Sequence, residues 1–417
     1  MIYWPESQGS ALPTVGYNRA IGLAAKALSD VIVGDPKRAQ ARIYCNIPWH
    51  HDPKSLRVGD LPLIAWTMFE STRLPSAWRD FLNRHCDAIM VPTQHCRDMF
   101  RLSGITRPLA VVPFGVDRDE FGPVPHRKHA GYNFLWQGHT YDPDGRKGAA
   151  VAERAYRELC RDSRIGDDAR LILKYRPHSN TPLEMDRIEV EPGITHVCGT
   201  LPADAMRDLM ETTDCCINPS HGEGFGLIPL EHMAMGRPVI LTGWSFPFLD
   251  PRYNIPIKYD LKPSPVMWCY PHVAWGPWGL EWNRGHGMEM HHLPRALKRV
   301  SNGAWEVGPG GKRDFVGRTW RATAWNALCD LQQRSGIYWR PGKPNEGGKI
   351  CFESTGLDAH ADVESLKDAM EKCYGNREKY RAMGARASEW ALSTWGIERI
   401  RNEFFEALLA FRSEGII

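Results

Sequence analysis

The chain has 417 residues, more than one ordinary core accommodates, so two domains are expected. Its hydrophobic fraction of 42% and charged fraction of 24% are those of a globular protein and exclude a disordered chain. The net charge of +3 is too small to indicate a polyanionic partner by itself.

No targeting or membrane segment is expected. Apolar runs stay shorter than the ~18 residues needed to cross a bilayer, and the N-terminus lacks a basic region followed by an apolar one. The eleven cysteines are scattered without a CxxC pair, which argues against a disulfide framework or a zinc site. We therefore expect reduced thiols, no metal site and a cytoplasmic location, in the host cytoplasm if the protein is viral.

Apolar strands alternate with amphipathic helices along most of the chain, which is typical of an α/β fold with parallel sheets. In the first part, strands are expected at 41–47, 61–69, 88–93 and 109–116, and helices at 17–30 and 76–86. A turn-rich exit after the last of these strands places the first domain at residues 1–120.

The second part repeats the alternation and is predicted to form a domain over residues 121–395. Strands are expected at 133–138, 171–176, 215–220 and 238–242, and helices at 148–162, 203–213, from about 229, and over 362–389. A final amphipathic helix over 396–417 is expected to pack back on the first domain.

Between 265 and 350 the alternation stops. Residues 271–349 hold seven tryptophans and twelve Lys or Arg against six Asp or Glu. This contrast predicts a Trp-rich basic insertion in the second domain. Three interpretations stay open: a small aromatic core with solvated charges, a surface for a polyanionic acceptor, and a surface for a saccharide.

The most informative segment is NPSHGEGFGLIPLEHMAMGRPVILT, residues 218–242. A buried strand ends at Ser220, a glycine-rich loop follows, and a helix starts near Ile228. Such a turn places unpaired backbone N–H groups and the positive end of a helix at the carboxyl edge of a parallel sheet. The segment therefore predicts a phosphate-binding site.

Two carboxylates, Glu223 and Glu231, flank this loop. Because phosphates repel carboxylates, we expect these two to accept hydrogen bonds from sugar hydroxyls instead. The alternative is that Glu231 only complements the helix dipole and Glu223 is a solvated loop residue.

The segment resembles the E-x7-E signature of retaining GT-B glycosyltransferases, particularly glycosyltransferase family 4. The resemblance implies two Rossmann-like domains facing a central cleft, with Glu223 on the transferred sugar and Glu231 on the ribose of the nucleotide. It also implies that the backbone of Gly224, Phe225 and Gly226 faces the diphosphate.

Other segments carry the same resemblance. Arg146 and Lys147 open a helix after the first strand of the second part, and Lys174 ends the run LILK within the next strand, as the basic residues of that family do. In the first part, residues 67–72, 87–93 and 111–117 are also similar to that family.

The family commonly has Gly-Arg at the end of the first strand of the second domain, whereas this chain has Gly138-His139. Arg146 or Arg176 would take that arginine's place on the phosphates. The resemblance implies a metal-independent enzyme without a cofactor, and we interpret Asp142-Pro143-Asp144 as a solvated turn rather than a metal-binding DxD.

Several residues of the first part are candidates for the acceptor side of the cleft. His50 and His51 follow one predicted strand, Trp66 and Glu70 lie at the end of the next, and Arg19 opens the first helix. The alternative for the histidines is a surface pair in a loop. We rank Glu70 first among these residues.

The sequence thus predicts a retaining glycosyltransferase, hexosyl- or pentosyl-, with a UDP- or GDP-linked donor and a hydroxyl acceptor. The acceptor is either a hydroxymethylated pyrimidine in viral DNA, as in bacteriophage DNA modification, or a glycan or lipid-linked saccharide. A non-catalytic sugar-nucleotide-binding protein and a phosphorylase are weaker alternatives. The oligomeric state stays open.

Overall fold

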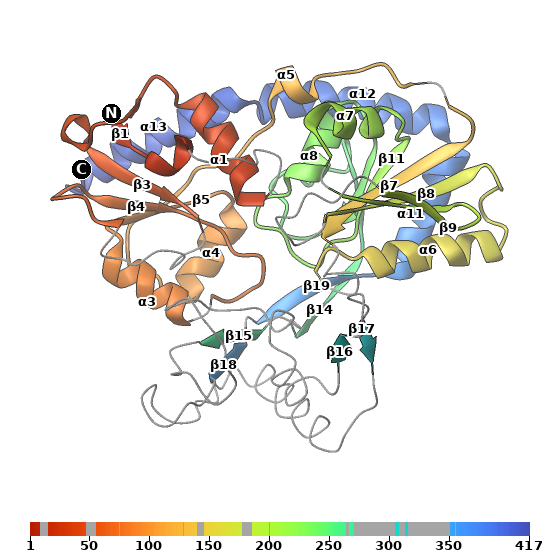
Figure 1. Cartoon of the computed structure of the whole chain (residues 1–417), viewed down its shortest axis with the longest axis horizontal. Helices are drawn as coiled ribbons and strands as arrows, with labels where there is room; N and C mark the ends of the chain where they lie inside the picture. Colours follow the sequence, from red (N-terminus) through yellow and green to blue (C-terminus); the bar gives the residue numbers. More distant parts are fainter. Residues whose placement is uncertain are drawn as a thin grey trace.

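The computed structural model describes residues 1–8, 16–46, 56–74, 76–127, 129–139, 146–176, 186–199, 201–263, 267–270, 305–307, 313–315, 351–354 and 356–417. Within them, two mainly parallel sheets lie side by side, each covered by helices (Figure 1). The α/β class predicted from the sequence is confirmed. None of the described helices is long and apolar enough to cross a membrane.

The first half of the molecule is built on a parallel six-stranded sheet of order β2-β1-β3-β4-β5-β6. Its strands are β1 (Ile2–Tyr3), β2 (Ile32–Val33), β3 (Ala41–Cys45), β4 (Leu63–Trp66), β5 (Ala88–Val91) and β6 (Leu109–Val111). Every residue of β3, β4 and β5 is buried. Continuous apolar runs are typical of parallel strands covered on both faces.

Short helices connect these strands. They are η1 (Pro5–Gln8), α1 (Gly16–Ala27), η2 (Pro36–Arg38), α3 (Ser76–His85), α4 (Gln94–Leu102) and α5 (Arg118–Phe121). The hydroxyl of Thr93 caps α4 by accepting from the backbone N–H of Cys96 at 3.0 Å.

The second half contains a seven-stranded sheet of order β13-β12-β11-β7-β8-β10-β9, in which β9 alone is antiparallel to its neighbour. Its strands are β7 (Tyr132–His139), β8 (Ala169–Arg176), β9 (Asp186–Glu191), β10 (Ile194–Cys198), β11 (Cys215–Asn218), β12 (Val239–Thr242) and β13 (Ile255–Ile257). Strands β9, β10 and β13 were not predicted from the sequence.

The helices of the second half are α6 (Ala149–Arg161), α7 (Ala203–Glu211), α8 (Leu227–Ala234), α11 (Val363–Gly375) and α12 (Arg377–Thr394). The predicted helix over 362–389 is two helices, because the backbone leaves the helical region at Asn376 (φ −125°, ψ 51°). Helix α12 packs closely on the end of α8, where a Cβ on Gly384 would lie 2.3 Å from the carbonyl oxygen of Gly236.

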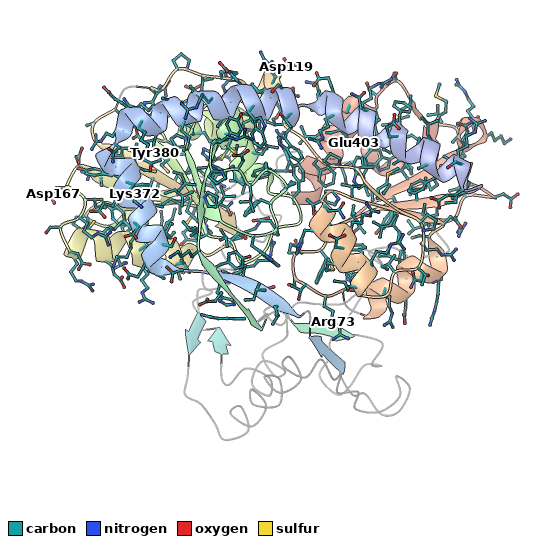
Figure 2. The ribbon with its side chains drawn as sticks, turned by 180° about the vertical axis from the view of Figure 1, so that it is seen from behind. Arg73, Asp119, Asp167, Lys372, Tyr380 and Glu403 are labelled. Carbon is teal, nitrogen blue, oxygen red and sulfur yellow. The ribbon has the colours of Figure 1, made fainter. Side chains whose placement is uncertain are left out.

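Helix α13 (Ile397–Ser413) continues from α12 and returns to the first half (Figure 2, where Tyr380 marks α12 and Glu403 marks α13). It lies against α1, and Arg401 donates to the carbonyl of Ala27 at 3.3 Å. Phe404 and Phe411 are buried in the same core as Trp66. The last helix therefore completes the core of the first half.

Three small antiparallel sheets lie below the two large ones (Figure 1). They pair β14 (Tyr259–Pro263) with β19 (Leu357–Ala361), β15 (Met267–Tyr270) with β18 (Cys351–Ser354), and β16 (Trp305–Val307) with β17 (Arg313–Phe315). The first two pairs bring residues 259–263 beside 357–361 and residues 267–270 beside 351–354, so the two ends of the predicted insertion lie next to each other. The remainder of the predicted Trp-rich insertion lies outside the described residues.

Candidate functional site

The carboxyl end of β11 leads into a buried loop, residues 219–226, which we call the glycine loop. Gly226 has a left-handed φ of 95° and caps α8, which begins at the next residue. Among the described residues, no acceptor takes the N–H groups of Gly224, Phe225 or Gly226. Unpaired N–H groups beside a helix N-terminus favour an anion at this position.

Glu223 forms the charged centre of the glycine loop. The Lys147 ammonium lies 2.6 Å from Oε1 of Glu223, and the Arg146 guanidinium lies 3.7 Å from Oε2. Only 7% of Glu223 is exposed. Burial raises the pKa of this carboxyl, but the two cations outweigh burial and hold the pKa below its usual range. Glu223 is therefore ionised and held by two cations.

The cations come from the turn that precedes α6. Burial lowers the pKa of the Lys147 ammonium, and neighbouring Arg146 acts in the same direction while Glu223 opposes them. Gly148 has a φ of 70°, and a Cβ there would lie 2.3 Å from the carbonyl oxygen of Pro219. Glycine thus lets this turn reach the glycine loop.

The first half contacts the glycine loop through the segment after β4. Glu70 lies 3.5 Å from the Arg146 guanidinium, so the structure brings Glu70, Arg146, Lys147 and Glu223 into one cluster. A Cβ on Gly222 would lie 2.4 Å from the carbonyl oxygen of Glu70. The two halves therefore meet at the loop without room for a side chain.

Glu231 forms a second buried ion pair, in this case with Arg19 of α1. Arg19 Nε lies 3.0 Å from Glu231 Oε1, and the same guanidinium also contacts Glu120. Burial raises the pKa of Glu231 above its usual range although Arg19 opposes the rise. The sequence placed Arg19 among the acceptor-side candidates, whereas in the structure it neutralises the carboxylate expected to bind the nucleotide.

Lys174 and Arg176 lie near the carboxyl end of β8. Lys174 is buried, and its ammonium donates to the carbonyl of Gly199 at 2.8 Å. Arg176 is the last residue of the strand, and its side chain lies outside the described part of the chain.

Trp66 is a core residue, so its predicted place on the acceptor side is wrong. Its side chain is 0% exposed, its indole N–H donates to the carbonyl of Val112, and its ring stacks on Phe114. Trp66 lies on the same face of β4 as Ile64, and its ring centroid lies 5.8 Å from that of Phe404 in α13. His50, His51 and the Asp142–Asp144 turn lie outside the described residues.

Sequence reasoning missed residues that support the glycine loop. The backbone N–H of Glu223 donates to the hydroxyl of Ser245, which has a positive φ of 66°. His221 stacks on His360 at 4.2 Å, and burial, with His360 beside it, lowers the pKa of His221 to about 4. Ser245 follows the informative segment directly, but His360 comes after the insertion and carries no local signal.

A pocket of about 460 Å³ opens between the two halves beside Ser245. Its lining includes Thr93, His95, Ser245, Phe246, Trp395 and Arg399. Because Ser245 also contacts Glu223, this pocket adjoins the charged cluster.

Comparisons with known proteins agree with this geometry. Residues 133–249, from β7 through the glycine loop and past β12, match the family model described as Glycosyl transferases group 1. No curated protein sequence matches the chain.

Among solved structures, the chain is similar to HepE from Anabaena in complex with UDP and glucose, with a TM-score of 0.53 at 11% identity over 98% of this chain and 99% of HepE. It is also similar to S. aureus TarM in complex with Fondaparinux, alpha-GlcNAc-glycerol and UDP, with a TM-score of 0.51 at 10% identity over 94% of this chain and 58% of TarM. These similarities show the GT-B fold that the sequence predicted. The family match and the fold together support a glycosyltransferase.

Proposed function

We propose that this protein is a retaining glycosyltransferase that moves a sugar from a UDP- or GDP-linked donor to a hydroxyl acceptor. The observation that carries the proposal is the cluster of Glu223, Lys147 and Arg146 at a glycine loop with unpaired N–H groups. The loop offers donors for a diphosphate, and the carboxylate next to it offers acceptors for sugar hydroxyls. A nucleotide sugar carries both a diphosphate and sugar hydroxyls, so it matches both groups.

In this proposal the donor rearranges the ion pairs at the glycine loop. Lys147 and Arg146 form ion pairs with Glu223 and Glu70. A diphosphate bound to the loop competes for both cations, which frees the Glu223 carboxylate for the sugar. Lys147 and Arg146 then stabilise the charge that builds on the leaving diphosphate, a task that needs no metal ion.

Glu231 is proposed to bind the ribose. It is buried on α8, eight residues after Glu223, and its present partner is Arg19. Ribose hydroxyls would replace part of that ion pair, and Arg19 would keep its contact with Glu120. Lys174 is proposed as a further cation near the phosphates, with Arg176 in the same role.

The transfer step passes through an oxocarbenium-like transition state. The protein's contribution is to hold donor and acceptor together and to stabilise the departing diphosphate. As the resemblance implies, the acceptor hydroxyl attacks the face that the diphosphate leaves, and the diphosphate receives the hydroxyl proton. The configuration at the anomeric carbon is then retained.

The acceptor is proposed to be a hydroxymethylated pyrimidine in DNA. The support is the composition of residues 271–349, whose seven tryptophans and local excess of Lys and Arg suit a nucleic-acid backbone and extruded bases. A glycan or lipid-linked saccharide is the alternative, because indole faces also bind sugars.

The test is mass spectrometry of products after incubation with a panel of nucleotide sugars. The acceptors are duplex DNA carrying hydroxymethylcytosine or hydroxymethyluracil, unmodified DNA, and simple glycans. Glu223→Ala is the inactive variant, and Glu389→Ala, at an exposed position on α12, is the matched control.

Transfer by the wild type and Glu389→Ala, absent in Glu223→Ala, supports the proposal. A sugar mass on the modified base supports the DNA acceptor, whereas extension of a glycan alone excludes it. Absence of transfer from every donor to every acceptor contradicts the assignment as a transferase.

A further inference from the structure

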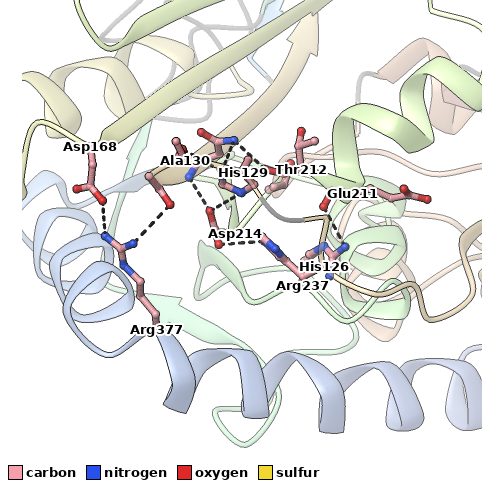
Figure 3. Close-up of polar contacts among 12 residues, drawn as sticks. His126, His129, Ala130, Asp168, Glu211, Thr212, Asp214, Arg237 and Arg377 are labelled. Atoms are coloured by element: carbon pink, nitrogen blue, oxygen red, sulfur yellow. Dashed lines mark hydrogen bonds and ion pairs between the residues drawn. The ribbon is translucent and has the colours of Figure 1, made fainter.

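Three potential metal-ligating side chains meet just before the start of β11 (Figure 3). We call His126, His129 and Asp214 the His–Asp cluster. His126 Nε2 lies 2.9 Å from Asp214 Oδ1, and His129 Nε2 lies 3.1 Å from Oδ2. One ligand atom from each residue lies within 4.8 Å of the other two.

The imidazoles of the cluster lie against the carboxylate, with His126 Nε2 facing Oδ1 and His129 Nε2 facing Oδ2. Among the described residues, Nε2 of His126 and Nε2 of His129 are buried atoms without an aligned hydrogen-bond partner. The two ring centroids lie 5.1 Å apart, and the side chain of Asp214 is 1% exposed. Two ring nitrogens that face a buried carboxylate in this way are arranged to share a cation with it.

Other contacts orient the carboxylate. The backbone N–H of Asn133 donates to Asp214 Oδ2 at 2.8 Å. On the ring side, His129 Nδ1 lies 3.2 Å from the carbonyl oxygen of Ala130 and 3.4 Å from the side-chain amide nitrogen of Asn133. Such outer contacts orient metal ligands in proteins.

Two arginines oppose a cation at this position. Arg381 lies 3.3 Å from Asp214 Oδ1, but its side chain is 52% exposed and can turn toward solvent. Arg237 is engaged by the carbonyls of Met210, Glu211 and Pro125. The mobile competitor is therefore Arg381, and its displacement lowers the affinity for a metal ion without blocking the position.

We propose that the His–Asp cluster binds a divalent transition-metal ion of the zinc class. Two imidazole nitrogens and one carboxylate oxygen suit Zn²⁺ at distances of about 2.0–2.2 Å and leave a fourth position for water. Mg²⁺ and Ca²⁺ prefer all-oxygen ligands and fit this set poorly.

The position of the cluster gives the ion a structural role. His126 and His129 belong to the segment between α5 and β7, which connects the two halves, and Asp214 directly precedes β11. The ion would fix this connection on the second half. The glycine loop begins at the other end of β11, so the ion lies away from the sugar-transfer site. This inference does not depend on the proposed function.

The experiment uses the full chain, stripped of metal and then titrated with Zn²⁺ in competition with a chromophoric chelator. The wild type should hold about one tightly bound zinc ion per chain and gain about 3–5 °C in melting midpoint at saturating zinc. His126→Asn/His129→Asn should lose both effects. His85→Asn, at a partly buried histidine that ends α3, is the matched control and should keep both.

A second variant tests the opposing charge. Arg381→Gln should bind zinc several-fold more tightly than the wild type, because the competing guanidinium is gone. A purely structural ion pair of Asp214 with the histidines predicts no such gain.

Two outcomes would overturn the proposal. One is zinc binding by His126→Asn/His129→Asn equal to that of the wild type. The other is an intense thiolate-to-cobalt charge-transfer band in the Co²⁺-loaded chain, which would place the ion on cysteines.

Discussion

The two ends of strand β11 favour ligands of opposite charge. At the carboxyl end, the glycine loop gathers unpaired N–H groups, Lys147 and Arg146, and therefore favours an anion. At the other end, Asp214 faces two imidazoles and favours a cation. The buried strand β11 positions both sites, because the segment before a strand and the segment after it lie at opposite edges of the sheet. The comparison predicts that the two ends work independently.

Lys147→Ala should cause the largest effect. Removing the ammonium leaves Glu223 buried with Arg146 alone and takes away a group that stabilises the leaving diphosphate, so kcat should fall by about 10²–10³-fold. Lys372→Ala, at an exposed lysine on α11, is the matched control and should leave kcat unchanged (Figure 2). Steady-state kinetics with the donor identified by mass spectrometry would measure this. If the two ends are independent, Lys147→Ala binds zinc like the wild type.

Gly222→Ala should have the next largest effect. The added Cβ would lie 2.4 Å from the carbonyl oxygen of Glu70, so the two halves must move apart at the loop. A displacement of about 1 Å at a reacting centre can cost about 10²-fold in rate, and we expect a fall of that order in kcat/KM. Gly375→Ala, where a Cβ meets nothing within 4 Å, is the control. Equal kinetics of the two variants would contradict the tight contact between the halves.

Removal of metal is the most direct test of whether the sites at the two ends of β11 act independently. A chelator should lower the melting midpoint of the zinc-loaded chain by about 3–5 °C, yet change the affinity for the donor nucleotide by less than about twofold, since distant sites are nearly additive. Calorimetric titration with UDP or GDP before and after chelation measures this. Loss of transfer on chelation would contradict both the independence of the two ends and the proposal of metal-independent transfer.

The smallest expected effect is a pH dependence of the free energy of unfolding, caused by Glu231 and Glu223 at the carboxyl end of β11. Burial raises the pKa of Glu231 above its ordinary value of 4.5, so the stability contributed by its protonated form is present below pH 4.5 and lost as pH rises through the raised pKa. Glu223 has a lowered pKa, so its contribution is present above pH 4.5 and lost as pH falls through that pKa.

Glu231→Gln stays neutral at all pH values and should therefore remove part of the loss of stability above pH 4.5. Urea unfolding of this variant and of Glu389→Gln across the range from acid to neutral pH would show the difference. Identical profiles would contradict the raised pKa of Glu231.

The sequence predicted much of the fold and of the glycine loop for a physical reason. The loop, the strand before it and the helix after it form one contiguous segment, so Glu223, Glu231 and the glycines appear in order. Glu70 was proposed from its place at a strand end and Arg146 from the family resemblance, and the structure brings the two together.

The parts that the sequence did not predict depend on contacts between distant residues. His126, His129 and Asp214 meet only after the connection folds onto the second half, so their spacing resembles no metal-binding motif. Trp66 follows the pattern of a strand end, but its direction depends on α13, which comes much later in the chain. The partner of Glu231 likewise comes from the first helix, 212 residues away.

The return of α13 to the first half affects the order in which the protein can fold during synthesis. Phe404 and Phe411 complete the core that contains Trp66, but they leave the ribosome only after the whole second half. Until then an apolar surface of the first half stays in contact with water. The nascent chain is therefore prone to aggregate unless a chaperone covers this surface. Folding of the first half is therefore linked to translation of residues 397–413, even though its sheet is complete at residue 111.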